Sequence, residues 1–191
     1  MINSGISPSK ERVLGFFDHE VSMYILKDVD RLTNEIRPDK GTGLRGCTVP
    51  LAMMLFAVID LFGYLTSDDE NPRKSNTLGN FKYLMSEKVN FFPKIYKDNY
   101  EKIVKLFRHG LIHQFFPKAS GIAKAGLGNP LIFESSGIPN LNVDVLSKDV
   151  KEALGKLKQS IAENRDNSLV ERINSRLDKL AKEDYETLNS F

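Results

Sequence analysis

The sequence predicts an all-α protein, a helical bundle that carries a small β-hairpin and a C-terminal helical extension. Apolar residues recur at helical spacing through most of the 191-residue chain. One apolar run, residues 49–65, has the composition of a helix at the centre of a bundle. Glycine, proline and short β-favouring runs gather in one segment, residues 119–146. The length and the 41% apolar fraction suit a single soluble domain over residues 1–191.

The first helix is predicted over residues 8–36. Ser7 is placed to cap it, Pro8 suits its first position and Pro38 stops it. The following residues, 37–46, form a loop rich in glycine and charge. The apolar residues at helical spacing predict the buried face of this helix: Val13, Leu14, Phe17, Val21, Tyr24, Ile25, Val29, Leu32 and Ile36.

The second helix is the apolar run, which begins near Thr48 and Pro50 and extends to about Leu65. Because it is apolar all round, we expect it at the centre of the bundle. The run has 17 residues, fewer than the roughly 20 that span a membrane, so a core helix is the better interpretation. Asp60 lies inside it and needs a partner, since an unpaired buried carboxylate is costly. It could orient a histidine or pair with an arginine, and a structural role is favoured over a catalytic one.

Two more helices complete the predicted core, which spans residues 8–116. Thr77 opens a shorter helix over residues 78–87, after a polar loop. A longer helix follows over about residues 95–116, and Pro117 stops it.

The remaining chain divides into a loop region, 117–146, and C-terminal helices, 147–191. In the loop region we expect a hairpin that pairs residues 122–125 with 131–134 through a GLGNP turn, and a further extended piece at 142–146.

In the C-terminal region, Ser147 is predicted to cap a helix that ends near residue 163. A second helix restarts at Ser168, which forms a capping-box pattern with Glu171. A coiled-coil-like seam on this last helix would dock on the bundle or on a second subunit: Val170, Ile173, Leu177 and Leu180.

Charge and cysteine content indicate which partners and which cellular compartment to expect. The formal net charge is only +2, but residues 82–124 carry nine positive and three negative side chains, a local excess that would attract phosphates. The single cysteine, Cys47, excludes an internal disulfide. The first residues lack an apolar run flanked by basic residues. We expect a cytoplasmic protein that does not bind a membrane.

The basic region contains the most distinctive motif, 105-KLFRHGLIHQFFPKAS-120, in which Arg108, His109 and His113 lie within six positions. The two histidines are four apart, as in an H-E-x-x-H zinc site. However, Gly110 replaces the glutamate of that pattern, and the one other histidine is the distant His19. We therefore expect neither a metal nor another cofactor.

Acid–base chemistry on RNA is a second interpretation of the motif. A histidine can take a proton from a 2′-hydroxyl or give one to a leaving 5′-oxygen, and an arginine can neutralise charge on the phosphate. Positions five apart on a regular helix are separated by roughly 140° around its axis. Arg108 and His113 of one chain would therefore not converge on one phosphate, whereas two copies facing across a dimer axis would.

A third interpretation is structural, because cationic side chains near a helix C-terminus complement the helix dipole. From physical considerations alone, this interpretation is the favoured one.

A family resemblance shifts the balance towards RNA. An R-x4–6-H pattern near the end of a long helix, with a polar residue after the arginine, resembles the HEPN superfamily, and Arg108, His109 and His113 match that pattern at its shortest spacing. The apolar helix with its D-L-F-G sequence, residues 60–63, also looks like the second helix of many such proteins. The similarity covers roughly residues 8–116. His109 departs from the commoner asparagine or aspartate.

The resemblance implies a HEPN-like helical bundle, often a homodimer, and commonly a metal-independent endoribonuclease of bacterial toxin–antitoxin, abortive-infection or other stress and phage-defence systems. Arg108 would stabilise the phosphate, His113 would be the acid or base and His109 an auxiliary residue. Lys102, Lys105 and Lys118 are the candidates for binding the RNA backbone. Some members of the superfamily are inactive, so a non-catalytic module that binds a nucleotide, RNA, an antitoxin or another partner protein is the alternative. A helical adaptor that works through the seam in residues 168–188 is a third.

Overall fold

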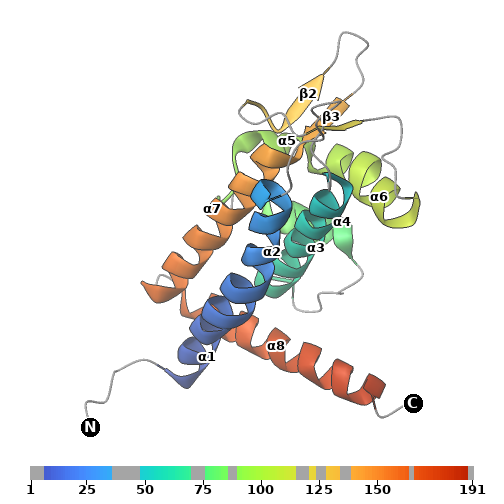
Figure 1. The fold of residues 1–191 in the computed structure, drawn as a ribbon. Coiled ribbons are helices and arrows are strands. Elements are labelled where there is room, and N and C mark those ends of the chain that lie inside the picture. Colours follow the sequence, from blue (N-terminus) through green and yellow to red (C-terminus); the bar gives the residue numbers. More distant parts are fainter. Residues whose placement is uncertain are drawn as a thin grey trace.

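Helices form a bundle around one central apolar helix, and a small sheet lies at one end of it (Figure 1). The all-α class with a small β insertion is therefore confirmed. The computed structural model describes residues 7–35, 48–69, 76–85, 90–114, 121–123, 128–133, 139–163 and 166–188.

The chain begins with one continuous helical rod whose hydrogen bonding alternates between α and π. Ser7 caps it as predicted, because the Ser7 side chain accepts a hydrogen bond from the Lys10 backbone N–H at 3.3 Å. The predicted end at residue 36 lies outside the described residues. The successive stretches are α1 (Pro8–Phe16), η1 (Phe17–Ile25), α2 (Leu26–Asp30) and η2 (Arg31–Glu35).

The π-helical turns change which side chains of the rod face the core. Phe17 and Val21 are buried as predicted, but Tyr24 is 69% exposed and does not belong to the buried face. Ile25, Val29 and Leu32, which come later in the rod, still face the core as predicted. The wider π turns therefore displace Tyr24 alone among the described residues of the predicted face.

The central helix is α3 (Thr48–Thr66), and it occupies the core as predicted. Its Phe62 ring lies 5.5 Å from that of Phe17, and its Phe56 ring 5.9 Å from that of Phe81. Among the described residues, α3 is the one helix long and apolar enough to cross a membrane. Slightly more than half of it is buried within the bundle, and core helices of soluble proteins have the same length and composition.

Two helical segments pack beside α3. The first, α4 (Thr77–Leu84), begins one residue before the predicted range of 78–87 and ends three residues earlier. Its cap is Asn76, whose side chain accepts a hydrogen bond from the Gly79 N–H at 3.1 Å. The second is continuous and matches the predicted long helix up to residue 114, beyond which residues 115–117 lie outside the description. It comprises α5 (Lys94–Lys102), η3 (Ile103–Arg108) and α6 (His109–Gln114).

Three short strands form a mixed sheet rather than the predicted hairpin. They are β1 (Gly121–Ala123), β2 (Leu131–Phe133) and β3 (Pro139–Asn142). The strand order is β1-β3-β2, so β3 separates the two strands that the sequence was expected to pair. Both neighbours align with the buried Leu141, which faces Ile122 in the parallel pair and Leu131 in the antiparallel pair. Burial of Leu131 and Leu141 explains why β3 lies in the middle.

The two C-terminal helices begin at other residues than predicted. The extended piece expected at 142–146 is instead β3 followed directly by α7 (Val143–Ala162). Ser147, the predicted cap, lies buried inside α7 and its hydroxyl contacts that of Thr33 at 3.2 Å. The chain then restarts, as expected, in α8 (Asn167–Leu188).

The cap of α8 is Asp166 and not Ser168. The Asp166 Oδ1 atom accepts the Leu169 backbone N–H at 3.0 Å, while the Ser168 hydroxyl donates to the same carboxylate at 2.6 Å. Aspartate competes well for an N-cap because its carboxylate also complements the helix dipole. The seam of α8 packs on the bundle: Val170 and Ile173 are buried, and Leu177 and Leu180 pack against the same core.

Candidate functional site

Arg108 is the last residue of η3 and forms an ion pair with the core helix. Its Nη2 atom donates to Oδ2 of Asp60 on α3 at 3.3 Å. The side chains of Arg108 and Asp60 are only 21% and 17% exposed. The structure thus brings together two residues that the sequence marked separately, the buried carboxylate and the motif arginine.

Two residues of α4 complete the environment of the Asp60 carboxylate. The Thr77 hydroxyl donates to Oδ2 at 2.8 Å, and the Asn80 side-chain amide donates to Oδ1 at 2.7 Å. These four residues, Asp60, Thr77, Asn80 and Arg108, are called the Asp60 cluster below. Both carboxylate oxygens are occupied, so the cost of burying the charge is offset by three hydrogen bonds.

A glycine positions α4 for this cluster. The helix approaches α3 so closely at Gly63 that a Cβ there would lie 2.2 Å from the Asn80 carbonyl oxygen. Only glycine permits that approach, and it places Thr77 and Asn80 beside Asp60, one turn earlier on α3. The α4 contribution to the cluster was not predicted from the sequence.

The cluster anchors the arginine to α3 at one nitrogen atom. A single bond joins Nη2 to the carboxylate, and among the described residues no hydrogen-bond partner is recorded for the other guanidinium nitrogens of Arg108. A cation fixed in this way loses little entropy when it binds a phosphate oxygen, which is the requirement for electrostatic stabilisation of a transition state.

The histidines of the motif follow in α6. His109 is its first residue and is partly exposed. His113 lies one turn further along the same helix, but its side chain is outside the described part of the chain. Its position relative to Arg108 therefore stays a prediction from helical geometry, and so does the catalytic assignment of Arg108, His109 and His113.

Two of the three lysines proposed to bind RNA, Lys102 and Lys105, are exposed on the helix that leads to Arg108. Lys105 pairs with Glu101 at 3.2 Å, and this hydrogen bond is the main cause of a lowered Glu101 pKa. The positive charge of Lys82 on α4 also lowers the Glu101 pKa, so Lys82 lies on the same side of the bundle as Glu101 and Lys105. Lys82 is one of the nine positive side chains that the sequence places in residues 82–124, and the structure puts it on another helix than Lys102 and Lys105. Lys118, the third lysine, lies outside the described residues.

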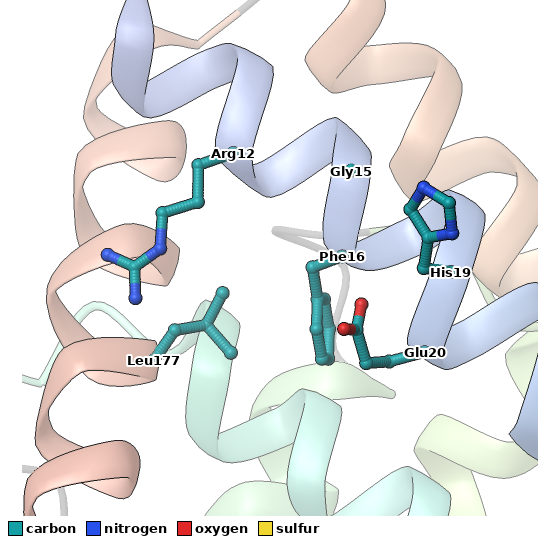
Figure 2. A pocket seen from close by; sticks show the side chains of 6 residues that line it. All are labelled: Arg12, Gly15, Phe16, His19, Glu20 and Leu177. Atoms are coloured by element: carbon teal, nitrogen blue, oxygen red, sulfur yellow. The ribbon is translucent and has the colours of Figure 1, made fainter.

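A second feature is a cavity of about 360 Å³ between the first helical rod and α8 (Figure 2). Phe16 and Leu177 form apolar walls, and the side chains of Arg12, His19 and Glu20 surround them. This cavity could not be predicted from the sequence, because the two helices that form it come from opposite ends of the chain.

The described residues do not suggest a metal centre. No group of three or more histidine, cysteine, aspartate or glutamate side chains in this part of the chain is arranged to hold a metal ion. The chemistry available at the Asp60 cluster is that of an anchored cation, and His109 directly follows it along the chain.

Comparison with known proteins gives no family for the chain: no family model, no curated protein and no solved structure matches it.

Proposed function

We propose that the protein is a metal-independent endoribonuclease of HEPN type that acts in bacterial defence or the stress response. The observation that carries the proposal is the anchoring of Arg108, whose guanidinium donates to Asp60 while Thr77 and Asn80 hold Asp60 in turn. A structural charge near a helix end does not need its partner to be anchored by two further side chains.

The proposed chemistry is cleavage by the 2′-hydroxyl of the RNA itself. The 2′-oxygen attacks the adjacent phosphorus, the bond to the 5′-oxygen breaks, and a 2′,3′-cyclic phosphate and a 5′-hydroxyl are formed. His113 transfers the proton, Arg108 neutralises charge on the phosphate oxygens, and His109 assists. Lys102, Lys105 and Lys118 bind the flanking backbone through their charges.

The site is proposed to require two chains. Arg108 precedes His113 by five residues in a helical stretch, so the two side chains point in directions separated by roughly 140° in regular α-helical geometry. A homodimer that brings the motif of one chain against that of the other would place both groups on one phosphate.

The test is cleavage of single-stranded RNA in the presence of EDTA by the wild type, Arg108→Ala and His113→Ala. We expect each variant to lose at least about 100-fold in rate, the usual contribution of a transition-state charge or an acid–base group. Arg31→Ala is the matched control, because Arg31 also pairs with an aspartate but lies exposed on the first helical rod. Equal cleavage by the wild type and Arg108→Ala would contradict the proposal.

A second candidate is a non-catalytic module that binds RNA, a nucleotide or a partner protein. The observation that favours it is the burial of the Arg108–Asp60 pair, which neutralises both charges. Under this candidate no RNA is cleaved, and Arg108→Ala lowers the melting temperature instead. Measuring thermal unfolding and RNA cleavage on the same preparations separates the two functions.

A further inference from the structure

Arg176, in the middle of α8, is an almost fully buried arginine with 5% of its surface exposed. The helix that carries it lies across the end of the bundle opposite the small sheet (Figure 1). A buried guanidinium lowers stability unless its donors find partners and its position serves the fold or the site. The atoms that it contacts therefore indicate what it does.

Both terminal nitrogens of this guanidinium bond to the backbone at the end of the central helix. Nη1 donates to the Tyr64 carbonyl oxygen at 2.5 Å, and Nη2 donates to the Asp69 carbonyl oxygen at 2.9 Å. The guanidinium carbon also lies 5.6 Å from the centroid of the Tyr64 ring, a cation–π distance. Carbonyl groups in the last turn of a helix have no partner within the helix, and a cation suits that end of the dipole. Arg176 thus joins the last turns of α3 to the chain that leaves them.

The turn of α3 that Arg176 holds is also the turn on which α4 packs. Gly63 directly precedes Tyr64, and a Cβ at Gly63 would lie 2.2 Å from the Asn80 carbonyl oxygen. Burial lowers the Arg176 pKa, and the charges of Tyr64 and of Tyr83 on α4 oppose this shift, so α4 lies close to the guanidinium. A displacement of this turn would therefore move α4 as well, because the two backbones are in contact.

We propose that Arg176 positions α4 against α3 and thereby keeps Thr77 and Asn80 on the Asp60 carboxylate. Those two side chains donate to Asp60 at 2.8 and 2.7 Å and lie on the helix whose seat Arg176 fixes. The consequence for chemistry rests on the ribonuclease proposed above, in which Asp60 anchors Arg108. In that reaction Arg176 is a positioning residue, which acts on the site through two helices and does not contact the RNA.

Two substitutions release the carbonyl oxygens without removing the bulk of the side chain. Arg176→Lys keeps the charge, but one ammonium group does not span two acceptors as the rigid guanidinium fork does. Arg176→Met keeps the length and buries no charge, a replacement that folded proteins commonly tolerate. Arg172→Lys and Arg172→Met are the matched controls on the same helix. Arg172 donates to Ser168 at 2.9 Å and lies 3.7 Å from Asp166, so these contacts are confined to the start of α8.

Amide hydrogen exchange under native conditions measures how firmly α4 is held, because local opening is reported separately for each helix. The Asn80 N–H, which donates to the Asn76 carbonyl oxygen at 2.9 Å, is a reporter inside α4, and the amides of α7 are the reference. We expect both Arg176 variants to exchange at least about tenfold faster in α4 relative to α7, as loss of hydrogen bonds from a charged group implies. The Arg172 variants should exchange as the wild type does.

Equal acceleration in α4 and α7 would show that Arg176 stabilises only the fold as a whole, and it would overturn the inference. Unchanged exchange in α4 would overturn it too. In the cleavage assay, kcat of the Arg176 variants should fall about tenfold, as loss of a supporting residue does, with KM within about twofold, because the lysines that bind the backbone remain. Faster exchange in α4 with an unchanged kcat would overturn the link to the site. Absence of cleavage by the wild type would contradict the ribonuclease proposal, whereas the exchange rates would still decide whether Arg176 positions α4.

Discussion

Asp60 receives hydrogen bonds from three side chains that belong to two other helical segments. Two of them, Thr77 and Asn80, hold the carboxylate in place, and the third comes from Arg108. The Asp60 side chain is only 17% exposed, and these donors replace the hydrogen bonds that water would otherwise make to it. Asp60 therefore affects the proposed chemistry indirectly, by positioning Arg108.

Asp60→Asn tests that role, since the amide keeps the size and some hydrogen bonding but removes the charge that holds Arg108. We expect a loss of roughly 1–3 kcal/mol in the free energy of unfolding, the cost of leaving a half-buried polar partner unpaired. RNA cleavage should fall by about 10–100-fold, as loss of a supporting carboxylate does. Urea unfolding and a cleavage assay measure the two effects.

The matched control is Asp28→Asn, which removes the carboxylate of the exposed Asp28–Arg31 pair. An exposed pair contributes at most about 1 kcal/mol, so this variant should stay close to the wild type in stability. Similar stability and similar cleavage for both variants would show that Asp60 does not position Arg108.

The element that brings donors to Asp60 is α4, and its distance from α3 depends on one residue. At Gly63 a side chain would meet the Asn80 backbone, with the carbonyl carbon at 2.5 Å and the oxygen at 2.2 Å. Backbone atoms cannot rotate away as a side chain does, so the whole helix has to shift.

Gly63→Ala is therefore expected to destabilise the protein by roughly 1–3 kcal/mol, the typical cost of overpacking a core. The shift also moves Asn80 off the carboxylate, so cleavage should fall together with stability. Gly155→Ala is the control, because its Cβ meets no atom, and it should stabilise the protein by roughly 0.5–1 kcal/mol. Urea unfolding of the two variants checks the difference in sign, and a neutral Gly63→Ala would mean that α3 and α4 are further apart than described.

Elements whose ends depend on local chemistry could be predicted from the sequence. The Ser7 cap and the extent of the apolar helix α3 are examples, because cap residues and apolar periodicity lie within a few positions of the feature they specify. The sheet could not be predicted in the same way. Its order depends on Leu141 being buried between two other strands, which is a property of the folded core and not of the segment.

At the scale of the whole molecule, the candidate site was likewise predicted only where the signal was local to the sequence. Sequence patterns marked Asp60 as needing a partner and marked Arg108 within the motif, because each is unusual in its own surroundings. That the two residues pair, and that Thr77, Asn80 and Lys82 lie close by, follows from the packing of α4 between α3 and the long helix. Such contacts join residues far apart along the chain, and no local pattern records them.

The assembly that joins Arg108 to His113 can be tested by mixing two inactive variants. If each site takes Arg108 from one chain and His113 from the other, a dimer of Arg108→Ala with His113→Ala contains one site with both groups intact. Half of randomly paired dimers are of this mixed type, so the mixture should recover about a quarter of the wild-type rate under two-fold symmetry. The rate of RNA cleavage after co-refolding measures this recovery.

One control shows whether the recovered cleavage comes from a site shared between two chains. Mixing Arg108→Ala with the double variant Arg108→Ala/His113→Ala supplies no intact arginine and should recover nothing. Absence of recovery in the active mixture would mean that no site shared between chains is formed.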